Sequence, residues 1–234
     1  MPRPLALIGV FVASLLVFIV WNMPAAPFVR HLDGQMIGDA PLQVSQIRGR
    51  LWDGEARWRW QRYRGELQWE TRWRGLTPGV ELDLAGSGLE VRGWAGASPR
   101  AVSARDLSLR VPLAEISRDM PEGRIDGVLT GQVSHLRLAR SGDVFAQGQL
   151  YYAGGEVSWP PDGNATVPPL EGRLFTEDNV ARLEVTDPQG TRLVDGQVNA
   201  GEAALRVYRA WPRLLGVSQG GQDSDVVFQV TQSL

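Results

Sequence analysis

Residues 56–73 read ARWRWQRYRGELQWETRW, and the alternation in this stretch decides the fold. In its first part tryptophans alternate with arginines, and in its second part apolar side chains alternate with charged or amide ones. Successive side chains of a β-strand point to opposite faces, so this period of two predicts two strands with one apolar face each. With a turn at 61–65 between them, we expect an antiparallel hairpin. Its apolar face carries Trp58, Trp60, Trp69 and Trp73.

The same alternation recurs along the rest of the chain. Further strands are expected at 81–84, 89–91, 107–111, 125–138 (with a bulge before Leu136), 144–152, 170–175, 180–185, 192–198, 203–208 and 226–230. Only Pro112–Met120 and Tyr208–Val217 are expected to form short helices, and Trp159–Pro169 predicts a loop between two sub-sheets. We therefore predict an all-β fold, a long twisted antiparallel sheet that folds over an apolar interior or leaves its apolar face open as a groove.

The N-terminal residues differ from this pattern. From Leu5 to Met23 the chain carries no charge. As a helix this segment spans about 28 Å, close to the hydrocarbon thickness of a bilayer. We predict a cytoplasmic tail at 1–4, a transmembrane anchor at 5–23, a linker at 24–41 and an exported β-rich domain at 42–234. A cleaved signal peptide is the alternative, which Pro27 directly after the cleavage position disfavours.

Composition limits the chemistry that the chain can perform. It has no cysteine, which excludes disulfides, thiolate nucleophiles and cysteine metal sites. The two histidines, His31 and His135, share no metal-binding spacing, and no serine lies in a nucleophile-elbow motif. We therefore expect no catalytic activity, no cofactor and no metal. The net charge is −2, and the arginines and tryptophans of 48–74 fall on opposite strand faces, so no nucleic-acid partner is expected.

A short motif near the start of the β-rich domain gives a family resemblance. Residues 47–56 read IRGRLWDGEA, and this stretch resembles the G-x-[LV]-W-[DS]-G signature of the type II secretion system protein N family through Gly49, Trp52, Asp53 and Gly54. The family's usual Gly-Thr is Gly49-Arg50 here. Three later stretches agree with the family: Leu67 with Trp69, Arg206–Tyr208, and Leu214–Gly216. The motif predicts a structural role, in which the two glycines permit a bend with Trp52 buried beside it.

The resemblance implies an accessory, non-catalytic, single-pass protein of the bacterial inner membrane, with most of the chain in the periplasm. Its family supports the type II secretion machinery, which exports folded proteins across the outer membrane. The expected partners are other inner-membrane or periplasmic subunits, contacted through sheet edges or loops. The strand pattern leaves a second function open, a membrane-tethered groove that binds or transfers lipid on the apolar face. Whether that face is covered or open distinguishes the two functions.

Overall fold

The computed structural model describes residues 14, 18, 22–37, 40–118, 123–199, 201–217 and 220–233. A large sheet contains β1 (Met36–Ile37), β2 (Ala40–Gly49), β3 (Asp53–Trp60), β4 (Tyr63–Thr71), β5 (Gly79–Gly86), β6 (Leu89–Ala97), β7 (Ala101–Pro112), β9 (Val128–Ala139), β10 (Val144–Tyr152), β13 (Leu170–Glu177), β14 (Val180–Thr186), β15 (Arg192–Val198), β16 (Glu202–Tyr208) and β17 (Val226–Ser233). A small sheet contains β8 (Arg124–Ile125), β11 (Gly155–Trp159) and β12 (Gly163–Val167). The short helices are α2 (Ala26–Val29), α3 (Leu113–Ser117) and α4 (Ala210–Leu214), with a 3-10 turn η1 (Arg30–Leu32).

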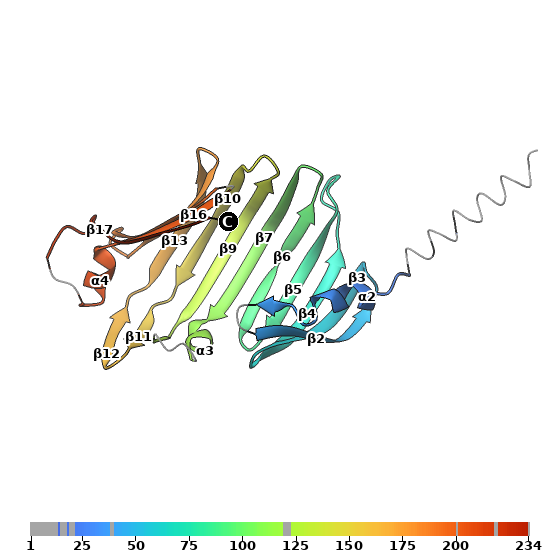
Figure 1. Ribbon diagram of the computed structural model, residues 1–234, viewed down its shortest axis with the longest axis horizontal. Helices are drawn as coiled ribbons and strands as arrows, with labels where there is room; N and C mark the ends of the chain where they lie inside the picture. Colours follow the sequence, from blue (N-terminus) through green and yellow to red (C-terminus); the bar gives the residue numbers. More distant parts are fainter. Residues whose placement is uncertain are drawn as a thin grey trace, which may run out of the picture.

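The large sheet is an antiparallel meander, in which each strand pairs with the next one along the chain (Figure 1). Two insertions interrupt it: β8 lies between β7 and β9, and the β11–β12 hairpin lies between β10 and β13. The inserted strands pair with one another as the small sheet. The large sheet is twisted, since β2 and β16 cross the view at a shallow angle while β7 and β9 run steeply (Figure 1). The predicted all-β class and long antiparallel sheet are confirmed.

The pairing register gives the sheet one polar and one apolar face. On the polar face, ion pairs link directly paired residues, as between Arg57 and Glu66 at 3.6 Å. Such exposed pairs contribute little stability, but the alternation fixes which face each strand turns to the interior. We call the opposite side the apolar face. Its members include Trp58, Trp60, Trp69, Leu82, Leu84, Val91, Leu109, Leu136, Leu138, Leu150, Leu183, Leu205, Phe228 and Val230.

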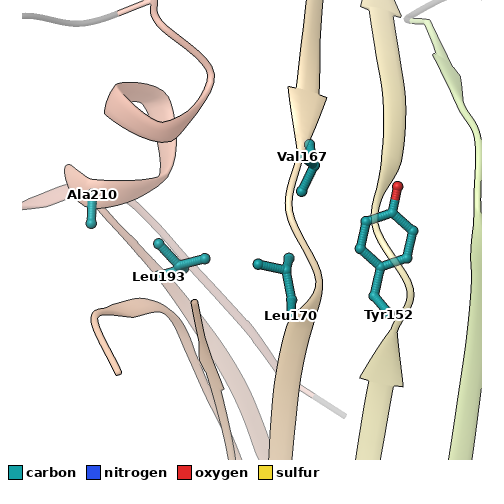
Figure 2. Close-up of a cluster of buried hydrophobic side chains, with 5 residues drawn as sticks. All are labelled: Tyr152, Val167, Leu170, Leu193 and Ala210. Carbon is teal, nitrogen blue, oxygen red and sulfur yellow. The ribbon is translucent and has the colours of Figure 1, made fainter. Parts of the chain in front are cut away.

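A buried cluster covers one end of the apolar face. Its buried members are Tyr152, Val167, Leu170, Leu193 and Ala210, which come from β10, β12, β13, β15 and α4 (Figure 2). Trp211 and Leu214 of α4 pack against this cluster, so the helix covers the sheet there. A second, smaller cluster joins Val144, Ala146 and Ala181 farther along the strands. Full burial of a valine or leucine side chain, as at Val167, Leu170 and Leu193, stabilises the fold by about 1.5–3 kcal/mol each, so these clusters hold the C-terminal half of the sheet together.

Several predicted elements are found at or near their expected positions. The strand predicted at 144–152 coincides with β10. Both predicted helical segments contain a short helix, α3 and α4. The bulge expected before Leu136 lies at Ser134, which the register with β10 skips, because Val133 and His135 pair with the consecutive residues Gly148 and Gln147.

Two segments differ from expectation. The stretch 159–169 is not a loop throughout, because β12 lies within it and pairs with β11. Its Asn164 and Thr166 alternate with less exposed neighbours, a strand pattern that the surrounding prolines obscured. The large sheet continues past this hairpin, since β10 pairs directly with β13. The predicted linker, 24–41, contains α2, η1 and β1.

The predicted anchor, 5–23, lies mostly outside the described residues. Within the part of the chain that the structure describes, we find no helix with the length and apolar character needed to cross a bilayer.

Candidate functional site

The signature motif forms the turn between β2 and β3. Arg50 N–H donates to the carbonyl of Asp53 at 2.7 Å, which closes the turn. Gly49 has a φ of +90°, a left-handed conformation that side chains other than glycine rarely adopt. A Cβ atom at Gly49 would also lie 2.5 Å from the Asp53 carbonyl oxygen. Glycine is therefore required at this position both by the backbone and by the space available.

The motif turn joins three segments of the chain. Leu51 N–H donates to the carbonyl of Met23 at 2.9 Å, which ties the turn to the segment before α2. The indole Nε1 of Trp69, on β4, donates to the Arg50 carbonyl at 3.3 Å. Trp52 is half-buried beside the turn, not buried as expected. The hydrogen bonds to Met23 and from Trp69 both use backbone atoms of the motif. The motif therefore connects the N-terminal segment to the sheet and has a structural role.

Three of the four predicted tryptophans share the apolar face. Trp58 and Trp60 of β3 and Trp69 of β4 lie on the same side by register, each half-buried. Trp73 does not join them, because β4 ends at Thr71 and its side chain is 64% exposed. The alternation continues to Trp73 in the sequence, but the chain turns away there.

The apolar face is open over much of its area. Leu82 on β5, Leu138 on β9 and Leu205 on β16 are 37%, 50% and 39% exposed. Near the edge of the sheet, Phe228 and Val230 are 53% and 44% exposed. Large contiguous apolar surfaces on soluble domains commonly mark interaction sites for protein, membrane or ligand. Outside the clusters described above, this face is thus a candidate binding surface.

On the polar face, the pKa of the central histidine is perturbed. Burial lowers the pKa of His135, on β9, and the positive charges of Arg105 and Arg137 lower it further. The ring of His135 packs against Phe145 with centroids 5.0 Å apart. Among the described residues, no group of three or more histidine, aspartate or glutamate side chains is placed to hold a metal ion. His31 lies in η1, in the segment that precedes β1.

Sequence reasoning missed Trp94, the largest of the fully buried side chains in the described part of the chain, with 1% exposure. It pairs with Glu81 and so lies on the face of the sheet that carries the ion pairs, not on the apolar face. Its Nε1 donates to the Arg72 carbonyl at 2.8 Å, and its ring fills the space over Gly79 and Gly96. The two glycines were the signal in the sequence, but only the register brings them beside the ring.

Comparison with known proteins identifies the family. The family model described as type II secretion system (T2SS), protein N matches residues 40–219, which is more than half of the chain. The chain belongs to this family. The matched region begins at the first residue of β2 and ends after α4, so it includes the motif turn and the apolar face up to β16. No curated protein and no solved structure matches the chain.

Proposed function

We propose that this chain is an accessory, non-catalytic component of the type II secretion machinery, anchored in the bacterial inner membrane, that supports the export of folded proteins from the periplasm across the outer membrane. The observation that carries the proposal is the family match over 40–219. The motif turn fits this role, because it fixes the position of the N-terminal segment against the first strands through backbone hydrogen bonds. The proposed partners are other inner-membrane or periplasmic subunits of the machinery.

Deletion of the gene in a host that exports proteins by this route tests the proposal. We expect folded exoproteins to accumulate in the periplasm and the wild-type gene to restore their export. Fractionation is expected to find the protein in the inner membrane. After mild solubilisation of that membrane, we expect other subunits of the machinery to co-purify with it. Normal export in the deletion strain contradicts the proposal.

A specific observation favours a second function, binding or transfer of lipid. The apolar face stays open, with Leu138 half exposed near the end of β9. An acyl chain laid along such a face removes apolar surface from water on both partners, which stabilises the complex by about 25 cal/mol per Å² buried. The long row of neighbouring strands offers a continuous surface for such a chain.

Lipid that co-purifies with the protein decides between the two functions. We expect mass spectrometry of the purified full chain to detect bound phospholipid if the face serves lipid. Leu138→Glu is then expected to remove most of this lipid, since it places a charge on the open face. Gln132→Glu is the matched control, because it adds the same charge on the polar face of the same strand. Lipid at equal, background levels in all three proteins excludes the second function.

A further inference from the structure

The two edges of the large sheet differ in how their backbone groups are satisfied. At the β2 edge, the chain's own N-terminal segment lies along the outer side. Val44 N–H donates to the carboxylate of Asp33 at 2.9 Å. Leu42 N–H donates to the Gln35 carbonyl at 2.8 Å, and Gly34 N–H donates to the Leu42 carbonyl at 2.7 Å. These contacts leave this part of the edge occupied.

The remainder of the β2 edge is protected as well. Its β1 partner pairs with Ala40 and Pro41, and Pro41 has no N–H to offer a further strand. At the other end of β2, Ala25 N–H donates to the Gly49 carbonyl at 3.4 Å. In the middle of β2, an irregularity after Ser45 interrupts its regular pairing with β3. These are the devices by which natural sheets prevent the addition of strands.

The β17 edge has almost none of these devices. Among the described residues, β17 pairs only with β16, and its outer side has no partner strand. Its sequence, VVFQVTQS, contains no charge and no proline. Val226, Val227, Phe228 and Val230 are 47%, 41%, 53% and 44% exposed. The pairing of β17 with β16 has one irregularity, at Val227. From Phe228 to Ser233 the pairing is regular. Such an edge is a template for another strand.

We propose that β17 is a self-association edge, which pairs antiparallel with β17 of a second copy of this chain. In the register centred on Gln229, Phe228 of each copy lies opposite Val230 of the other. Both of these side chains belong to the apolar face, so two apolar cross-strand pairs form at the centre of the interface. The strand carries no charge, so no like charges meet when two copies approach.

The difference between the edges determines the size of this assembly. A strand added to the β2 edge would have to displace the segment 23–37, so β17 of one copy is not expected to pair with β2 of the next. This excludes head-to-tail growth into an open filament. Pairing of β17 with β17 is instead isologous and uses up the open edge of both copies, which gives a closed dimer. The inference goes beyond the secretion role and does not depend on it.

Cysteine crosslinking tests the proposal directly, because the natural chain has no cysteine. In the proposed register the two Gln229 residues are directly opposite, with Cα atoms about 4.5–5.5 Å apart, within the range that a disulfide spans. Purified full chain carrying Gln229→Cys is expected to form a covalent dimer under mild oxidation. The control is Gln43→Cys, an exposed glutamine on the same face of the protected β2 edge, which is expected to stay uncrosslinked.

Charge substitutions test the same contact without a covalent bond. Gln229→Lys and Gln229→Glu each place two like charges opposite one another, so each variant alone is expected to shift towards the monomer. An equimolar mixture of the two is expected to recover the dimer as a mixed pair. Light scattering or native mass spectrometry measures the mass, and circular dichroism verifies that both variants fold. The proposal is overturned if the wild type has the mass of one chain at every concentration, or if a dimer persists unchanged in Gln229→Lys.

Discussion

The indole ring of Trp69 occupies the space that a Cβ atom on Gly54 would need. The two residues are direct partners on β3 and β4. The same relationship recurs within the β3–β4 pair, where Trp58 lies over its partner Gly65, and in the small sheet, where Trp159 lies over its partner Gly163. A large ring that covers a glycine on the next strand fills the gap left by the missing side chain and fixes the register. At these positions the tryptophan and the glycine therefore depend on each other, in the large sheet and in the small one.

Gly54→Ala is expected to destabilise the protein by about 1–3 kcal/mol, because the added methyl group must displace the Trp69 ring or the backbone at Arg48. Urea unfolding measures the change. Gly201→Ala is the matched control, since no atom lies within 4 Å of the position that its Cβ would take. We expect that variant to stay within about 0.5 kcal/mol of wild type. Equal stability of the two variants contradicts the packing argument.

Trp94→Ala is expected to cost about 3–5 kcal/mol, because it removes a fully buried ring and leaves a cavity over two glycines. The contacts of the Arg74 and Arg105 guanidinium groups with the ring, at 5.5 and 5.9 Å, are lost with it. Trp73→Ala serves as the control, since Trp73 is 64% exposed, and should change stability by less than about 0.5 kcal/mol. The comparison uses denaturant midpoints, and a similar shift for both variants refutes the assignment of Trp94 to the core.

The strands were predictable because a period of two depends only on local backbone geometry and the need to bury one face. The hairpin around Trp58 and Trp69 follows from that rule, and the secretion family followed from a local motif at 49–54. The burial of Trp94 does not follow from that rule. It depends on Gly79 and Gly96, which lie on two strands and come together only through the register.

The unequal edges of the sheet were also beyond local reasoning. The prolines and glycines of 24–41 predicted a linker, and nothing in that composition indicates that Asp33 would accept a hydrogen bond from Val44 eleven residues later. The end of β4 at Thr71 likewise depends on the turn at 74–77, in which Arg74 and Thr77 bridge, and not on the alternation that continues to Trp73.

Tyr152→Phe tests the link between the large sheet and the small one. The Tyr152 hydroxyl donates to the Asp126 carbonyl at 2.6 Å, so its loss is expected to cost about 0.5–1.5 kcal/mol. Tyr151→Phe is the neighbouring control on the polar face, 45% exposed, and should be close to neutral. Burial, and then the charge of Asp126, raises the pKa of Tyr152. The stability that Tyr152 contributes is therefore full below the unfolded pKa of about 10 and is lost as pH rises towards the higher pKa of the folded protein. In Tyr152→Phe, this alkaline loss of stability should be absent.

His135 is expected to make stability depend on pH in the mildly acidic range. Burial lowers its pKa, followed by Arg105 and Arg137, so the unfolded chain binds the proton more readily than the folded one. Stability should thus be full above the unfolded pKa of about 6.5 and fall as pH drops below it. His135→Gln should flatten this slope, measured as the thermal midpoint between about pH 5 and about pH 7. Arg137→Gln should flatten it partly, because one of the two positive neighbours is removed. An NMR titration in which the His135 pKa of the folded protein lies at or above the ordinary value would exclude this account.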